Sequence, residues 1–300
     1  MGNLLAHIRL TRPANIVTAV ADIWAGFAIS GVVAALISGD LSVYLGDMVW
    51  LTIATVGLYG GGVAFNDVFD AELDRVERPE RPIPSGQASV WSAGLMAAGL
   101  LLLGIIAALQ VGVWSGEIAV FIAVFAVIYD AWGKHQQIFG PINMGLCRGA
   151  NLLLGVSLIS ESIGPNWYLA LVPIAYISAI TMISRGEVRG KNRSALLGGL
   201  WIYFAIFAAL LAISVKQQGY GFWQVVPFIG LFAYLILPPL WKAIATQEPK
   251  HIGKAVKAGV LSLIVMNACF AAAFAGWWVA LIILALLPLS RWLAKRFAVT

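Results

Sequence analysis

Residues 88–109 read ASVWSAGLMAAGLLLLGIIAAL, and none of these side chains is charged. About 20 apolar residues in a helix are enough to cross the hydrocarbon core of a membrane. The run shows no alternation between polar and apolar residues, so it predicts a helix and not a strand of a membrane barrel. This stretch therefore predicts an α-helical membrane protein.

Nine further apolar segments lie on both sides of this stretch. They span approximately residues 14–38, 43–65, 113–131, 141–160, 166–184, 195–214, 222–241, 256–275 and 277–293. Hydrophobic residues make up 61% of the chain and charged residues only 11%, whereas an ordinary soluble domain has about 25% charged residues. We predict a single all-α domain over residues 1–300, a polytopic bundle of nine to ten transmembrane helices. The number stays open because the last two segments are short.

The composition excludes several other classes of protein. A mean hydropathy of +0.89 is far too high for a disordered chain. Cys147 and Cys269 lie inside apolar segments and show no CxxC spacing, which excludes a disulfide framework, a zinc finger and a c-type haem site.

The Lys and Arg residues indicate the orientation of the chain. If the helices alternate in direction, all but two of the 19 basic residues fall on one side of the membrane, the exceptions being Arg148 and Lys216. The positive-inside rule then predicts a multi-pass protein of an inner, plasma or thylakoid-type membrane with both termini cytoplasmic. This topology accounts for the net charge of +5, which would also attract the chain to anionic membrane lipid. Nothing in the charge pattern suggests nucleic acid binding, so we expect no nucleic acid partner.

An acidic motif follows the second apolar segment. Asp67, Asp70 and Asp74 fall within about 60° of one another if the helix continues, because successive residues turn by about 100°, and Asn66 lies about 40° from Asp70 on the same side. Like charges at this spacing repel each other and destabilise a helix, and a bound cation offsets that repulsion. Hard oxygen ligands suit Mg²⁺, so we predict a Mg²⁺ site formed by Asp67, Asp70 and Asp74. The alternative is a solvated acidic helix end.

A loop rich in Arg and Pro comes directly after the motif. Residues 75–86 read RVERPERPIPSG, and the three prolines prevent a regular helix and hold the loop extended. Arg78 and Arg81 could fold back over the metal site and bind phosphate oxygens. The alternative is that these arginines only anchor the cytoplasmic side.

Several polar residues stand alone in the apolar segments. Ionisable groups at membrane depth usually face the interior of a bundle and mark a functional path. Two roles are possible for Arg148: it could contact the substrate, or it could form a purely structural ion pair with Asp22 or Asp130. The candidates for substrate binding in and beside these segments are Asn15, Asp22, Asp130, Asn143 and Arg148.

Residues 66–86 closely resemble the first signature of the UbiA superfamily of intramembrane prenyltransferases, NDxxDxxxD followed by an RPxRPIPSG-type loop. The resemblance extends to Arg12-Pro13, to the Tyr129–Lys134 element and to a polar loop after the sixth segment. It implies a helical bundle with a central cavity open to lipid. It also implies transfer of a prenyl group from a prenyl diphosphate to an aromatic or other lipophilic acceptor, with Mg²⁺ held by two aspartate-rich motifs.

By position, the resemblance assigns roles to individual residues. Asn66, Asp67, Asp70 and Asp74 would carry the catalytic and metal-binding roles of the first motif. Arg78 and Lys134 would contact the diphosphate, and Tyr129 would line the site.

The second motif departs from the pattern of the superfamily. In place of DxxxD, residues 184–192 read SRGEVRGKN, in which Glu187 is the only acid and position 191 is Lys. We interpret Glu187 as the remaining catalytic carboxylate, and Arg185 and Arg189 as groups near the diphosphate. The alternative for Glu187 is an interfacial residue paired with a nearby arginine. Either these arginines replace a second metal ion in neutralising diphosphate, or the chain no longer ionises its substrate.

Two functions therefore remain open from the sequence. The first is a Mg²⁺-dependent prenyltransferase. The second is a binding or transport protein on the same fold, which moves a precursor of a secondary metabolite across the membrane. Residues 12–26 and 184–188 resemble the UbiA-like EboC branch, whose clusters are linked to such precursors.

Overall fold

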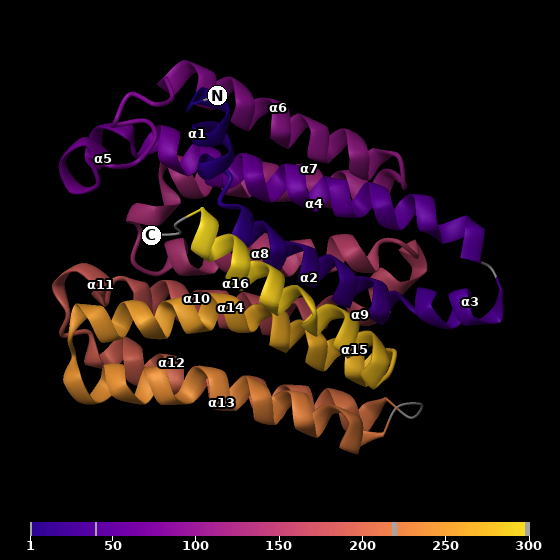
Figure 1. Cartoon of the computed structure of the whole chain (residues 1–300). Helices are drawn as coiled ribbons and strands as arrows, with labels where there is room; N and C mark the ends of the chain where they lie inside the picture. The colour runs from indigo at the N-terminus through magenta and orange to yellow at the C-terminus, as the bar shows by residue number, and fades with distance from the viewer. Residues whose placement is uncertain (1, 40, 218–220, 298–300) are drawn as a thin grey trace.

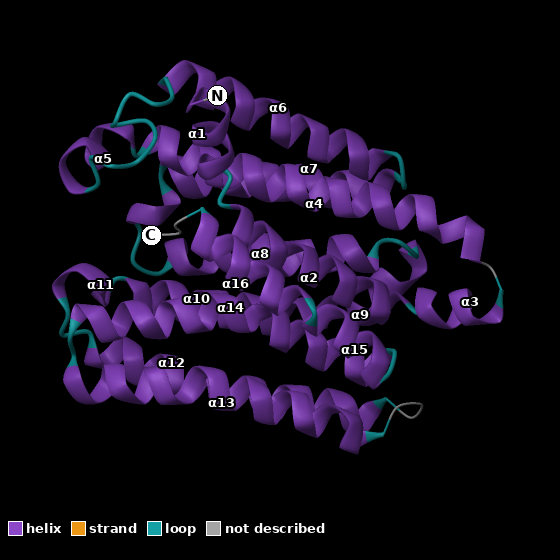
Figure 2. Cartoon of the chain, in the orientation of Figure 1, coloured by secondary structure: helices purple, strands orange, loops and turns teal. Residues whose placement is uncertain are grey.

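The computed structural model describes residues 2–39, 41–217 and 221–297, and the elements in these ranges are helices packed side by side (Figures 1 and 2). The main bundle consists of α2 (Pro13–Ser30), α4 (Leu41–Phe69), α6 (Val90–Leu109), α7 (Val113–Ala131), α8 (Phe139–Val156), α10 (Leu171–Ser184), α12 (Arg193–Lys216), α13 (Phe222–Thr246) and α14 (Pro249–Phe274), together with α15 (Trp277–Leu284) and α16 (Leu286–Arg296), which form one span between them. The other helices are α1 (Gly2–Leu10), α3 (Val32–Ser38), α5 (Ala71–Glu77), η1 (Gly133–His135), η2 (Ser160–Ser162), α9 (Ile163–Asn166), η3 (Trp167–Ala170) and α11 (Gly186–Arg189).

Nine stretches of the described residues are long and apolar enough to cross a membrane. Helix α8 has 18 residues, the length of a span, but is not among the nine because polar residues interrupt its apolar sequence. It packs against α2, α7 and α10, and its polar residues Asn143, Arg148 and Asn151 are buried. Neighbouring helices thus shield the polar residues of α8 from lipid, which is how such residues are tolerated at this depth. The prediction of an all-α, multi-pass membrane protein is confirmed.

Two of the expected segments are each divided into two α-helices in the structure, and segment 166–184 is divided into η3 and α10. Segment 14–38 breaks at Gly31, whose φ of 87° lies in the left-handed region that glycine adopts without steric cost. Segment 277–293 continues to Arg296 and consists of α15 and α16, which are separated by Ala285 alone.

Close backbone contacts hold the helices that carry the polar residues. A side-chain carbon added to Gly26 of α2 would lie 2.6 Å from the Cα atom of Gly155 in α8. Between α4 and α6, a carbon added to Gly104 would lie 2.8 Å from the Ala54 carbonyl oxygen. Small residues allow such close packing, which supplies much of the attraction between helices in lipid.

Helices α2 and α14 form the centre of the bundle, each with 72% of its span buried. Helices α15 and α16 pack against both of them. The Ser290 hydroxyl of α16 donates a hydrogen bond of 2.8 Å to the Ala14 carbonyl in the first turn of α2. The first and last spans therefore have their outer ends on the same side of the bundle (Figure 1).

The contact between α2 and α8 can be tested with a pair of glycine substitutions. Gly155→Ala should lower stability by about 1–3 kcal/mol because the added methyl group overlaps the backbone of α2. Gly99→Ala in α6 has open space around the added carbon, so it should stabilise the helix by up to about 1 kcal/mol. Thermal unfolding in one detergent measures both. Equal effects of the two substitutions would contradict the packing.

Candidate active site

The acidic motif lies where α4 ends and α5 begins. The backbone keeps helical spacing through this region, because the Asp70 N–H donates to the Asn66 carbonyl (3.0 Å) and the Asp74 N–H donates to the Asp70 carbonyl (2.8 Å). Asp70 itself lies between the two helices, with φ −88° and ψ 1°. The motif thus forms successive turns at one end of the bundle, as the sequence predicts.

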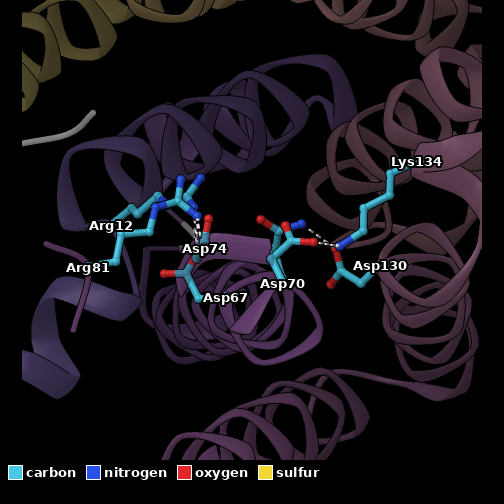
Figure 3. Close-up of polar contacts among 8 residues, drawn as sticks. Arg12, Asp67, Asp70, Asp74, Arg81, Asp130 and Lys134 are labelled. Atoms are coloured by element: carbon cyan, nitrogen blue, oxygen red, sulfur yellow. Dashed lines mark hydrogen bonds and ion pairs between the residues drawn. The ribbon is translucent and has the colours of Figure 1, made fainter. Parts of the chain in front are cut away.

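Asp67 and Asp74 are held by two arginines on one side of the motif (Figure 3). Nη1 of Arg81 lies 2.7 Å from Oδ2 of Asp74 and 3.2 Å from Oδ1 of Asp67. Nη2 of Arg12, at the start of α2, contacts the same Asp67 oxygen at 2.7 Å. Asp67, Asp74 and Arg81 are buried, so the loop after α5 folds back over the motif as expected.

Asp70 points to the other side of the motif, toward α7 (Figure 3). Its Oδ1 atom lies 2.5 Å from Nζ of Lys134, which lies in η1 just after α7. Beside this pair, the Asn66 amide donates a hydrogen bond of 2.9 Å to the buried carboxylate of Asp130, the penultimate residue of α7. Lys134 and Asp130 thereby connect the motif to the Tyr129–Lys134 element.

The expectation that three carboxylates share one face therefore holds for Asp67 and Asp74 and is wrong for Asp70. Within the described ranges, no group of three acidic, histidine or cysteine side chains is close enough to hold a metal ion. The physical reason is that the chain supplies its own cations, Arg12 and Arg81 on one side and Lys134 on the other.

A second buried ionic network lies deeper in the bundle. Asp22 of α2 is fully buried and lies 2.7 Å from Nε of Arg148 in α8. Its carboxylate also accepts hydrogen bonds from Asn267 of α14 (2.6 Å) and from Asn151 of α8 (3.1 Å). Arg148 donates a further hydrogen bond to the Thr18 hydroxyl. Of the two interpretations of Arg148, the structure shows the ion pair with Asp22; a contact with substrate stays a prediction.

Other candidate residues lie near the motif without joining its ion pairs. Asn143 is fully buried; in the amide orientation that satisfies its neighbours, it donates to the Phe125 carbonyl and accepts from the Tyr129 N–H. Arg185 donates to the carbonyls of Gln136 (2.6 Å) and Gln137 (2.8 Å), close to Lys134. Asn15, one turn after Arg12, and Tyr129 are both half-buried.

Glu187 lies in the four-residue helix α11, which packs against α14. Burial raises the pKa of its carboxyl group, and the nearby Arg78 guanidinium lowers that pKa in part. The Arg78 loop thus approaches the loop that carries Glu187. Lys191 lies beyond the end of α11 with φ 55°, so it is not one helical turn from Glu187. The side chain of Arg189 is outside the described part of the structure.

Residues 27–256 match the UbiA prenyltransferase family. The chain belongs to this family. A relative from Ignicoccus hospitalis, named digeranylgeranylglyceryl phosphate synthase, is 31% identical over 272 residues, which cover 83% of this chain and 84% of the relative. The expected class of enzyme, a prenyltransferase, is confirmed at the level of the family.

Solved structures of UbiA homologues share the fold. The apo structure of a homologue from Aeropyrum pernix has a TM-score of 0.66 at 16% identity and covers 85% of this chain and 96% of its own. A homologue from Archaeoglobus fulgidus bound to GPP and Mg²⁺ has a TM-score of 0.62 at 12% identity. The match covers 84% of this chain and 99% of the homologue.

Arg12 and Asn267 are among the contributors to these networks that the sequence did not identify as site residues. Arg12 was noted only as part of the family's Arg-Pro opening, and its contact with Asp67 joins residues 55 positions apart. Asn267 is an isolated amide inside the apolar segment 256–275. That isolation is the same signal that identified Asp22, and it could have identified Asn267 too.

The buried ion pairs can be tested by a double-mutant cycle. Arg81→Gln removes the positive charge that pairs with the buried carboxylates of Asp67 and Asp74. It should therefore destabilise the fold by about 3 kcal/mol. Asp74→Asn together with Arg81→Gln should cost clearly less than the sum of the single changes, because Asp67 keeps Arg12 and position 74 no longer carries a charge. Unfolding in detergent gives the three values. Additive costs would show that the pair does not interact.

The raised pKa of Glu187 predicts a pH dependence of stability. The folded protein favours the protonated carboxyl, so the stabilising contribution is complete below the unfolded pKa and is lost as the pH rises through the folded pKa. Glu187→Gln should therefore unfold at a higher temperature than the wild type near pH 7, and the difference should vanish near pH 4. Glu80→Gln, at an exposed position, is the control and should show no such trend.

Proposed function

We propose that the chain is a Mg²⁺-dependent intramembrane prenyltransferase that uses a prenyl diphosphate. The observation that carries the proposal is the set of carboxylates Asp67, Asp70 and Asp74, enclosed by Arg12, Arg81 and Lys134 at one end of the bundle. Diphosphate and a divalent cation together require this mixture of acidic and basic groups. The proposal takes residues 1–300 as one domain with cytoplasmic termini, supported by the distribution of Lys and Arg.

The donor groups of the motif fit a Mg²⁺ ion, although three carboxylates do not converge. Mg²⁺ usually takes one or two carboxylates and completes its shell with water and substrate phosphate. Asp67 and Asp70 would hold it, since the described ion pairs of each residue use only Oδ1 and leave Oδ2 for a metal ion. When bound, Mg²⁺ would supply Lewis-acid neutralisation of charge on the leaving diphosphate.

The chain's own cations would bind the diphosphate directly. Within the described contacts, Arg81 uses only Nη1 and Arg12 only Nη2, and a guanidinium has five N–H donors. The remaining N–H groups can donate to phosphate oxygens while the carboxylates stay paired. Lys134, on the opposite side of the motif, would place a third positive charge where negative charge develops.

The acceptor that we propose carries a glycerol phosphate group and not an aromatic ring. The support comes from relatives named digeranylgeranylglyceryl phosphate synthase, such as those from Ignicoccus hospitalis and Methanothermobacter thermautotrophicus. In the reaction, the acceptor hydroxyl oxygen forms a bond to C1 of the prenyl group. The bond from C1 to the diphosphate oxygen breaks, and the hydroxyl proton leaves with the diphosphate.

Release of diphosphate tests the proposal. Purified protein in detergent with a prenyl diphosphate, Mg²⁺ and a glycerol phosphate lipid acceptor should release diphosphate, and chelation of Mg²⁺ should stop it. Asp70→Asn should lower the rate at least about a hundredfold, because it removes a proposed metal ligand. Glu72→Gln, at an exposed position on α5, should leave the rate unchanged. Equal loss in both variants would contradict the assignment of Asp70.

A second candidate function is supported by the acid-poor loop of Glu187. The loop offers one carboxylate where the family has two, so a protein that binds an amphiphile for transport without ionising it is the alternative. Binding of a prenyl diphosphate without any metal-dependent release of diphosphate would favour this alternative over the transferase.

A further inference from the structure

A hollow of about 280 Å³ lies between α13, α14 and α16, away from the acidic motif. Three basic residues line it, Lys254 and Lys257 of α14 and Arg291 of α16. None of the three forms an ion pair or hydrogen bond with another described residue. Lys254 and Lys257 are three residues apart on one face of α14, so both can approach one ligand. The hollow is therefore an unneutralised positive site shared by two helices.

The hydroxyl of Ser262 gives this site a second, independent feature. Ser262 lines the same hollow and is only 1% exposed, and its Oγ atom has no hydrogen-bond partner among the described residues. A serine inside a helix usually donates to a carbonyl one turn earlier, and a buried hydroxyl without a partner costs free energy. A ligand with oxygen acceptors in the hollow would satisfy this hydroxyl.

The position of the hollow identifies the kind of ligand. Lys254 lies in the second turn of α14, and Arg291 directly follows Ser290, which donates to the Ala14 carbonyl in the first turn of α2. The basic groups are therefore at the same end of the bundle as Arg12. The apolar residues Leu235 and Leu261 also line the hollow. Positive charge at the membrane surface beside apolar walls matches an anionic headgroup with its hydrocarbon chains.

We propose that this hollow binds the phosphate headgroup of an anionic glycerophospholipid from the membrane. Lys254, Lys257 and Arg291 contact the phosphate, the Ser262 hydroxyl donates to one of its oxygens, and an acyl chain lies along Leu235 and Leu261. Basic pockets between transmembrane helices on the cytoplasmic side are known to bind lipid headgroups. The site does not depend on the proposed transferase function, because it shares no residue with the acidic motif.

Native mass spectrometry of the full-length protein in detergent tests the proposal. The probes are phosphatidylglycerol, phosphatidylcholine with the same acyl chains, inorganic phosphate and a prenyl diphosphate. We expect retention of phosphatidylglycerol and not of phosphatidylcholine, with no displacement by phosphate or prenyl diphosphate. Equal retention of the two lipids, or displacement by inorganic phosphate, would overturn the lipid site. Asp70→Asn should bind phosphatidylglycerol as the wild type does, which separates this test from that of the transferase.

Matched variants locate the binding. The combination K254Q, K257Q and R291Q should weaken phosphatidylglycerol binding about a hundredfold, at roughly fivefold for each cation. The control combination K250Q, K295Q and R296Q removes the same charge from exposed positions outside the hollow and should keep the affinity. Equal losses in both combinations would show a general effect of surface charge and overturn the proposal.

Ser262→Ala provides a test that is independent of charge. It should weaken phosphatidylglycerol binding by roughly tenfold, through the loss of a hydrogen bond to a charged group. The lipid-free protein should unfold at the same or a higher temperature, because the change removes a buried hydroxyl without a partner. Unchanged lipid affinity of this variant would remove Ser262 from the site and overturn the proposed headgroup geometry.

Discussion

Buried carboxylates in this bundle are each matched with a basic or amide group, and the arrangement of the helices depends on this matching. A charge at membrane depth is costly unless it is paired or faces a polar interior. Asp22 meets Arg148, Asn151 and Asn267, and this one carboxylate connects α2, α8 and α14. Because all three helices supply a partner, none can rotate or slide without leaving a buried polar group unpaired.

The same constraint connects the centre of the bundle to the acidic motif. Arg12 precedes α2 and contacts Asp67 near the end of α4, while Asp22 lies further along α2. One turn after Asp22, Gly26 of α2 packs closely against Gly155 of α8, and this contact fixes the two helices against each other. Arg12, which contacts Asp67 of the motif, therefore precedes a helix whose rotation is set by contacts inside the membrane, and this keeps the ion pair in place before substrate binds.

The sequence predicts the parts of this structure that depend on local patterns. Long apolar segments identified the helices, and the spacing of Asp67 and Asp74 placed both carboxylates on one side, where Arg81 contacts both. The break at Gly31 was missed because a glycine inside an apolar run also occurs in continuous helices. The direction of Asp70 depends on Lys134, 64 residues later, and the role of Arg12 depends on the packing of α2 against α4. Partners so distant in sequence leave no periodic signal near the motif.

The balance of charge around the motif explains how the site can operate with a reduced second motif. In the described contacts Asp67, Asp70 and Asp74 are matched by Arg12, Arg81 and Lys134, and Glu187 has Arg78 nearby. A diphosphate adds several negative charges to this balance, so under the proposed function one divalent cation compensates for most of them. A second aspartate-rich motif would add carboxylates that need a second cation. With Glu187 alone and Arg78 beside it, that requirement disappears, so the missing carboxylate and a single metal ion are consistent with each other.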